Sequence, residues 1–222
     1  MKASPSPKLG RPIDLRLRER RREQILDAAV KLFAEDGYTD ADTQVLAANL
    51  KIGKGTIYRY FPSKRELFLA AADRAMQQLQ VVVNQATSAV EEPLERIAVA
   101  IQAYLDFFDN RPEYVELLML ERAQFKDRVQ PTYFEHQEKN IGKWQGLFES
   151  LVAAGRVRDL PSEKITRVMS DLVYGTMFTN YFTRRRRSLG EQAKEILDVV
   201  FNGILSETER KQSERKQSEI RR

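Results

Sequence analysis

Apolar residues recur every three or four positions through most of this 222-residue chain, and proline or glycine interrupts the pattern at intervals. This period places the apolar side chains on one face of an α-helix. The chain has only 8 Pro and 10 Gly, whereas Leu, Ala, Glu, Arg and Gln, which favour helices, are abundant. The sequence therefore predicts an all-α protein of about nine helices and no strand.

Helix start and stop signals place the expected helices. Asp42 is an N-cap residue, and Ser63 with Glu66 forms a capping box at the start of a long helix. Gly37 and Gly155 follow the last apolar residues of their helices and act as stops. We expect helices over about 17–36, 43–50, 54–61, 64–90, 93–110, 112–121, 131–154, 162–187 and 190–207.

The basic residues are concentrated towards the N-terminus. Residues 1–65 contain 14 Lys and Arg against 8 Asp and Glu, whereas the rest of the chain contains 23 against 24. A net charge of +6 beside a body of net −1 is typical of a head that binds a polyanion. Solubility alone could also produce this asymmetry.

Some classes of chemistry have no residues to carry them. The chain has no cysteine and a single histidine, His136, so we expect no disulfide, metal site or cofactor. The segment 53–56 is not a phosphate-binding loop, because position 55 is Gly where that loop needs Ser or Thr. Without paired carboxylates or a nucleophile constellation, we do not expect an enzyme. With no signal-peptide core and no apolar run near about 18 residues, we expect a cytoplasmic protein.

Two short helices separated by the turn 51–53 have the layout of a helix-turn-helix DNA reader. Ile57 and Phe61 are four residues apart, so both can point inward and hold the second helix rigid. Small residues at the start of that helix would let its backbone approach DNA closely. The side chains placed to donate to phosphate oxygens are Tyr58, Tyr60 and Lys64.

The run Lys-Gly-Thr-Ile-Tyr-x-x-Phe-x-Ser-Lys at 54–64 resembles the DNA-binding domain of TetR/AcrR-type transcriptional regulators. Gly37-Tyr38 and Leu46-Ala47 extend the resemblance, which covers about residues 18–70. It implies a homodimer on a palindromic operator, and a C-terminal domain that binds a small effector and then releases the DNA. The residues then expected to contact DNA are Asp42, Thr43, Gly53, Lys54, Gly55, Thr56, Tyr58, Arg59, Tyr60 and Lys64.

Five positions depart from the family pattern: Asp42 replaces Ser or Thr, Thr43 an apolar residue, Lys51 Gly, Gly53 Ser or Thr, and Tyr60 His. Asp42 keeps the capping function, and Tyr60 remains a phosphate donor. Lys51 is destabilising if its position needs a positive φ, and Gly53 removes a cap that could also touch phosphate.

A basic arm precedes this domain. Arg11, within Gly10-Arg11-Pro12, could enter a narrow, A·T-rich minor groove. Alternatively, Arg11 and the arginine-rich run 16–22 are a solvated helix start. We expect a flexible basic arm (1–16), a helix-turn-helix domain (17–68), an effector-binding and dimerisation domain (69–208) and a polar charged tail (209–222).

The C-terminal helices have more apolar surface than one chain is expected to cover. Apolar residues of the segment 162–187 occupy nearly its whole circumference, so we expect it to be buried on all sides. The segment 190–207 has two adjoining apolar faces. This pattern favours pairing with a second copy as a four-helix bundle, although a larger monomer core would also bury it. The expected dimer interface consists of Val168, Leu172, Ile196, Val199, Val200 and Gly203.

Aromatic residues gather between positions 104 and 182, with polar residues beside them. Most belong to the core, but an aromatic cleft with a few polar anchors also suits a small apolar or aromatic effector. The candidate pocket residues are Tyr104, Phe108, Leu118, Glu121, Arg122, Phe125, Trp144, Phe148, Tyr174, Phe178 and Tyr181. The alternative functions are a helical ligand carrier or enzyme with a basic head, and a non-specific architectural DNA binder.

Overall fold

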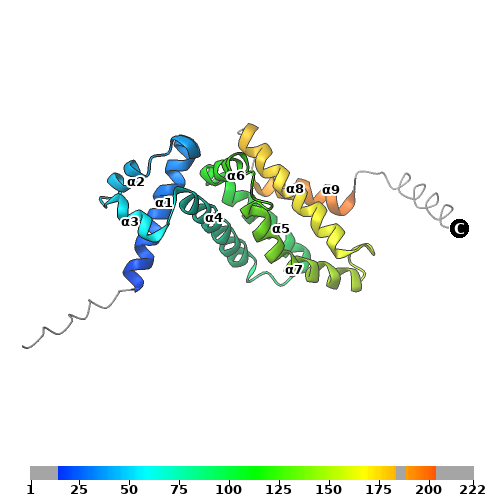
Figure 1. Cartoon of the computed structure of the whole chain (residues 1–222). Coiled ribbons are helices and arrows are strands. Elements are labelled where there is room, and N and C mark those ends of the chain that lie inside the picture. Colours follow the sequence, from blue (N-terminus) through cyan, green and yellow to red (C-terminus); the bar gives the residue numbers. More distant parts are fainter. Residues whose placement is uncertain (1–14, 184–188, 204–222) are drawn as a thin grey trace, which may run out of the picture. The chain divides into compact units, whose positions relative to one another are not determined.

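The computed structural model describes residues 15–183 and 189–203, and these form nine α-helices and no strand (Figure 1). The helices are α1 (Leu15–Asp40), α2 (Thr43–Asn49), α3 (Lys54–Tyr60), α4 (Lys64–Thr87), α5 (Pro93–Asp109), α6 (Pro112–Gln124), α7 (Thr132–Ala153), α8 (Ser162–Thr183) and α9 (Leu189–Asn202). The predicted all-α fold is confirmed. Arg11, with the rest of 1–14, and the tail 209–222 lie outside the described residues.

Side-chain caps start the helices where the sequence predicts them. Asp42 Oδ1 accepts a hydrogen bond from the Gln44 backbone N–H at 2.7 Å, which satisfies a donor in the first turn of α2. Ser63 Oγ accepts one from the Glu66 backbone N–H at 3.0 Å, as the first half of a capping box requires. The two segments on either side of α3 are therefore fixed by short polar residues.

Glycine and threonine mark the helix ends. α1 is kinked at Gly37 (φ 72°), the predicted stop, and is then assigned for three more residues to Asp40. α4 ends at Thr87, about one turn before the predicted end, and the Thr87 hydroxyl donates to the Val83 carbonyl oxygen at 2.8 Å. Such hydroxyl-to-backbone bonds compete with the helical ladder. The predicted ends of the last two helices, at about 187 and 207, lie outside the described residues.

The chain divides into two compact units. The first takes its described residues from Met1–Gln78 and Glu113–Lys139, and the second from Leu79–Pro112 and Asn140–Arg222. The first unit therefore contains α1, α2, α3, the start of α4, most of α6 and the start of α7. These units describe packing, and the functional boundaries expected at 16, 68 and 208 stay predictions.

The first unit packs α1, α2, α3 and the start of α4 around one core, and Figure 1 shows α2 and α3 beside α1. Phe33 of α1 meets Phe68 of α4 edge to face, with ring centroids 5.0 Å apart. Ile57 of α3 is fully buried against the same core, and burial of such a side chain contributes about 2 kcal/mol. The other fully buried large side chains of this core are Ile25, Leu26, Leu46 and Leu67.

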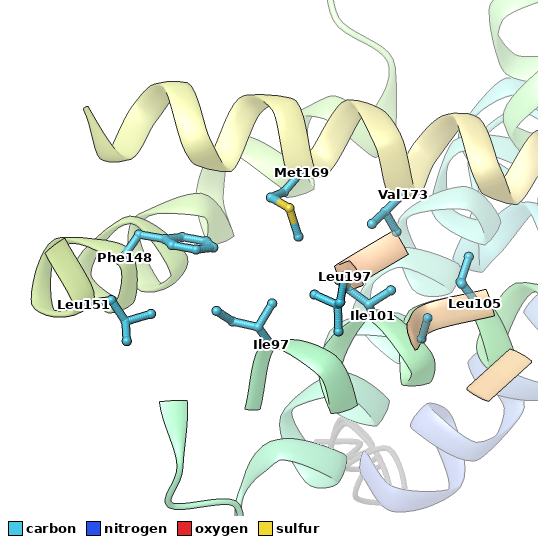
Figure 2. Close-up of a cluster of buried hydrophobic side chains, with 9 residues drawn as sticks. Ile97, Ile101, Leu105, Phe148, Leu151, Met169, Val173 and Leu197 are labelled. Carbon is cyan, nitrogen blue, oxygen red and sulfur yellow. The ribbon is translucent and has the colours of Figure 1, made fainter. Parts of the chain in front are cut away.

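The second unit has its own core, built on α5. Figure 2 shows Ile97 and Ile101 of α5 facing Met169 and Val173 of α8, with Leu197 of α9 beside Ile101. These residues recur at helical spacing along α5, α8 and α9, so one face of each helix is buried. The remaining buried members of this cluster are Leu105, Phe148, Leu151 and Ala193.

The α8 segment, predicted to be buried on all sides, is partly exposed in the single chain, so its complete burial stays a prediction that depends on a second copy. Val168 is 52% exposed, Leu172 37% and Phe182 66%, although Met169 and Val173 are buried. α8 contacts α5 with one face, so its other apolar face is left open to solvent. On α9, Val199 is likewise 52% exposed.

Candidate nucleic-acid interface

The turn between α2 and α3 is closed by backbone hydrogen bonds around one left-handed residue. The Lys51 N–H donates to the Ala48 carbonyl oxygen and the Ile52 N–H to the Ala47 carbonyl oxygen, both at 3.0 Å. Lys51 has φ 52°, in the left-handed region that favours glycine. A side chain in this conformation costs about 1 kcal/mol relative to glycine. The destabilisation expected for Lys51 at a position with positive φ therefore applies.

α3 is held from beneath and open on its outer side. Ile57 is fully buried and Phe61, which follows the helix, is 4% exposed. The Phe61 N–H also donates to the Ile57 carbonyl oxygen at 2.9 Å, so the last turn is closed. The predicted anchoring of this helix by two apolar side chains is confirmed. The exposed residues at its start and along its outer side are Gly53, Lys54, Gly55, Tyr58 and Arg59.

A hydroxyl pair links α3 to the start of α2. The Tyr58 phenol oxygen lies 3.1 Å from Thr43 Oγ1, and either oxygen can be the donor. Tyr58 is 36% exposed, whereas Thr43, also predicted to contact DNA, is only 3% exposed. Thr43 is thus placed to orient the phenol of Tyr58, and the pairing ties the two short helices together.

The polar residues around α3 also contact one another. Lys54 Nζ lies 3.9 Å from Asp42 Oδ1, so the residue that caps α2 also neutralises part of the charge at the start of α3. The Arg59 guanidinium donates to Thr56 Oγ1 at 3.4 Å, along the exposed side of the helix. These four predicted contact residues therefore form two polar pairs, one at the start of α3 and one along its exposed side.

Lys64 lies at the first turn of α4 and is half-buried. Its ammonium group donates to the Thr39 carbonyl oxygen at 2.9 Å and lies 5.0 Å from the centre of the Tyr38 ring. Both contacts hold the charge beside the end of α1. An ammonium group has three donors, so these contacts leave donors for a phosphate.

Two arginines of α1 lie beside the end of α3, which the sequence did not predict. The Arg18 guanidinium is 6.0 Å from the ring centre of Tyr60, and the Arg22 guanidinium is 5.6 Å from that of Phe61. Arg18 and Arg22 are four residues apart, and buried Ile25 follows on the same face of the helix. This spacing was the sequence signal that the two arginines share a face. Their partners lie about 40 residues away, so the spacing alone could not identify them.

The loop after α6 packs against this head. The Phe125 ring meets Tyr38 at 4.9 Å and Phe68 at 5.3 Å between centroids, and the Arg65 guanidinium lies 4.8 Å above it. Arg65 also forms an ion pair with Asp127 of the same loop. This hydrogen-bonded arginine lowers the pKa of the Asp127 carboxyl. The start of α4, directly after α3, is therefore held by a segment far along the chain.

Residues 25–71 match the model of a family described as bacterial regulatory proteins, tetR family. The match runs from α1 into α4 and so includes the turn and the whole of α3. This head, residues 25–71, therefore belongs to the TetR family. The resemblance stated from the sequence is confirmed.

Similar proteins cover more of this chain. The transcriptional repressor KstR of Mycolicibacterium smegmatis is 27% identical over 168 residues, 74% of this chain and 78% of KstR. The transcriptional activator FasR of the same organism is 32% identical over 101 residues, so the match spans only 46% of each protein. The structure of FadR from Bacillus subtilis in complex with stearoyl-CoA has a TM-score of 0.69 and 18% identity, and covers 82% of this chain and 99% of FadR. Its likeness shows that the shared fold extends beyond the head.

The predicted pocket residues fall into both compact units. Glu121, in the first unit, is 1% exposed, and its Oε1 accepts hydrogen bonds at 2.9 Å from the backbone N–H and the hydroxyl of Thr132. Arg128 donates to the same oxygen at 2.5 Å and to Glu135 at 2.6 Å. Of the other candidates in this unit, Leu118 and Phe125 are buried and Arg122 is exposed. Glu121 therefore fastens the loop between α6 and α7.

The remaining candidates lie in the second unit. The Tyr104 hydroxyl donates to Met177 Sδ at 3.6 Å, and its ring lies 5.1 Å from that of Phe108. Tyr174 and Phe178 meet edge to face at 4.9 Å. Trp144 packs against the core that contains Phe148, and Tyr181 lies edge to face with Phe182 at 5.5 Å. Phe108 and Phe148 are buried in this unit, whereas Tyr104, Trp144, Tyr174, Phe178 and Tyr181 are half-buried.

The predicted interface residues lie on α8 and α9, apart from Gly203, which follows α9. Val168, Leu172 and Val199 are exposed, and Gly203 is exposed with φ 74°. Ile196 and Val200 are instead half-buried against the core of Figure 2. The predicted interface residues that are accessible to a partner are therefore Val168, Leu172, Val199 and Gly203.

Within 15–183 and 189–203, no three His, Cys, Asp or Glu side chains lie together in a group that could hold a metal ion. His136 Nε2 lies 2.7 Å from Asp73 Oδ1, which joins α7 to α4 inside the first unit. In the same part of the chain, no helix combines the length and apolar character needed to cross a bilayer.

Proposed function

We propose that this chain is a homodimeric transcriptional repressor that binds a palindromic operator through α3 and leaves it when a small effector binds. The anchoring of α3 carries the DNA-binding part of the proposal. Ile57 and Phe61 fix the helix from beneath, while its start and outer side remain exposed. A rigid helix with an open polar surface is what reading of the major groove requires.

The exposed residues divide into two kinds of contact. Lys54 and Arg59 carry charged donors on the open side of the helix, which can pair with guanine O6 and N7. The main-chain N–H groups at Gly53 and Gly55 favour a phosphate at the helix start, because glycine lets the backbone come close. The side chains proposed to hold further phosphates are Tyr58, Tyr60 and Lys64, with Thr43 orienting Tyr58.

The open apolar face of α8 supports the dimer. Val168, Leu172 and Phe182 lie within about 80° of one another around the helix and are exposed in the single chain. Exposed apolar rows of this kind are costly in water, and a second copy would bury them against themselves around a two-fold axis. Two heads related in this way would read half-sites about 34–36 Å apart, or a multiple of that distance.

The comparisons support an apolar effector and repression. KstR is named as a repressor, and FadR was solved with stearoyl-CoA, whose acyl chain is apolar. The aromatic side chains of α5, α7 and α8 in this chain would suit an apolar ligand of the same kind. Binding would shift the population of conformers away from the one that holds DNA. We infer a regulator without catalytic activity that acts on chromosomal DNA in the cytoplasm.

The test is selection of bound fragments from genomic DNA, beginning with the region next to the gene for this protein, followed by footprinting. We expect a protected palindrome and an affinity at least about a thousand times that for random DNA of equal length. Arg59→Ala should reduce this ratio, whereas Arg167→Ala, an equal loss of charge on exposed α8, should not. A ratio near one would favour a non-specific architectural binder, and transcription in vitro would separate repression from the activation named for FasR.

A further inference from the structure

The N-terminal end of α1 extends beyond the core of its unit. α1 begins at Leu15, but its first buried residue is Ile25, and residues 15–20 are all exposed. At 1.5 Å per residue, about 15 Å of helix precedes the core. The segment 16–22, called here the arginine overhang, contains five Arg and one Glu. This segment buries little apolar surface, so its positive charge is the feature through which it can bind a partner.

The overhang has two faces with different neighbours. Arg18 and Arg22 are four residues apart and lie over the rings of Tyr60 and Phe61, at the C-terminal end of α3. Arg20 is two residues from each of them, which places it about 200° around the helix. One face of the overhang therefore adjoins the DNA-reading helix, and the opposite face points away from it.

Three acidic residues of α1 lie near the overhang and are occupied. Glu23 and Asp27 both form ion pairs with Arg74 of α4. The Arg22 guanidinium donates to Glu23 Oε1 at 3.4 Å and lies 3.8 Å from Glu19 Oε1. Arg22 therefore shares its charge with two carboxylates, whereas Arg18 forms no ion pair within the described residues, so net positive charge beside α3 is available to an anion.

Stacking on aromatic rings prepares these two arginines for phosphate. A guanidinium that lies over a ring keeps the N–H groups of its edge free to donate. Arg18 lies beside Tyr60, which is itself proposed to hold a phosphate. The partner that fits this surface is therefore the sugar-phosphate backbone next to the groove that α3 enters.

We propose that Arg18 and Arg22 bind backbone phosphates of the DNA, so that the arginine overhang is a second, sequence-independent part of the interface. This inference rests on the proposed DNA-binding function. Contacts to phosphate fix the position of a protein on the duplex without reading bases. The overhang should therefore add affinity equally to operator and random DNA.

The experiment measures DNA affinity against salt concentration for the full chain and for the double variant Arg18→Gln, Arg22→Gln. Each phosphate contact contributes about 0.9 to the slope of log affinity against log salt. We expect the double variant to lower the slope by about 1.8 for each head, with the ratio of operator to random affinity nearly unchanged. Arg18→Lys with Arg22→Lys should keep most of the slope, because the charges remain.

The control is Arg20→Gln, which removes one charge, half the number that the double variant removes, from the opposite face and should leave the slope almost unchanged. Circular dichroism and thermal unfolding of every variant check that the head is folded. The double variant should also lose its sensitivity to phosphates that have been neutralised as methylphosphonates, whereas the wild-type chain should be sensitive at defined positions.

Two results would overturn the inference. Equal slopes for the wild-type chain and the double glutamine variant would remove the phosphate contact while leaving the proposed function intact. A loss of slope per charge removed that is equal for Arg20→Gln and the double variant would show that overall charge, not the face beside α3, is responsible. Failure of the wild-type chain to prefer any DNA sequence would instead count against the proposed function itself.

Discussion

Arg65, in the first turn of α4, is paired with Asp127, in the loop after α6, although 62 residues separate them. The Arg65 guanidinium also covers the ring of Phe125. Because α4 follows α3 after only Phe61, Pro62 and Ser63, this pair controls where the end of the reading helix lies. The loop between α6 and α7 is therefore part of the support of the candidate interface.

The Asp127 carboxyl predicts a specific pH dependence of stability. Its hydrogen bond to Arg65 lowers its pKa below the unfolded value of about 3.9. The folded chain therefore gains stability from this group above that unfolded value, and loses it as the pH falls through the lower folded pKa. In urea unfolding, wild type should exceed Asp127→Asn at pH 6, and the difference should disappear in strong acid. In an Arg65→Gln background, Asp127→Asn should have no further effect; an undiminished effect there would contradict the pairing.

Truncation of the anchor beneath α3 should destabilise the head. Ile57 is fully buried, so Ile57→Ala removes buried methylene groups and leaves a cavity, at a cost of about 2–5 kcal/mol in the free energy of unfolding. DNA affinity should fall with it. Val45→Ala, on α2 at 47% exposure, is the matched control and should change stability by less than about 0.5 kcal/mol. Similar losses for the two variants would show that α3 is not anchored in this way.

The hydroxyl pair of Thr43 and Tyr58 separates orientation from DNA contact. Tyr58→Phe removes both the link to Thr43 and a donor to phosphate, so it should weaken binding to all DNA sequences. Thr43→Val removes only the link and should lower stability by about 1 kcal/mol with a smaller effect on affinity. If the two variants weaken DNA binding equally, the phenol acts on the fold alone and makes no phosphate contact.

Lys51→Gly should stabilise the chain. The residue adopts φ 52°, which glycine reaches without the clash of a Cβ atom. We expect a gain of about 1 kcal/mol in the free energy of unfolding, seen as a higher denaturant midpoint at unchanged slope. Lys54→Gly, the same substitution within α3, should instead lower the free energy of unfolding. A loss of stability for Lys51→Gly would mean that the lysine side chain makes a compensating contact.

The open face of α8 can be tested by charge. Val168→Asp should shift the chain from dimer to monomer in sedimentation, because a buried unpaired carboxylate is strongly unfavourable. Val81→Asp is the matched control, because Val81 of α4 is also 52% exposed and the substitution is the same. The wild-type chain should sediment as a dimer at micromolar concentration. A stable 25.7 kDa wild-type species, or equal dissociation by both variants, would reject this interface.

Local signals were sufficient for the helices and for the anchoring of α3. Pro93 and Pro112 mark helix starts within one residue, and Asp42 caps as its position predicts, because these effects act over one turn of backbone. Ile57 and Phe61 could be assigned inward from their spacing alone. The family resemblance added the functional meaning of that spacing.

Long-range pairs were beyond the sequence. Phe125 was a pocket candidate because an aromatic residue beside polar ones suits a ligand, yet the structure places it against Tyr38 and Arg65 of the head. Glu121 had the same ambiguity. The sequence alone does not distinguish a buried carboxylate that binds a ligand from one that accepts a hydrogen bond from Thr132. Helical periodicity shows which residues of the arginine overhang share a face of α1. It does not show which residues of other helices they contact.

The enclosed carboxylate of Glu121 has an evolutionary consequence. Removal of Arg128 alone would leave the buried Glu121 carboxylate without its cation, which costs about 3–5 kcal/mol. Removal of Glu121 leaves Arg128 paired with Glu135 but takes the acceptor away from the buried Thr132 N–H, so it is also unfavourable. Descendants of this gene should therefore rarely lose Arg128 without a change at Glu121. The two codons are expected to change together along a lineage, as a correlated pair.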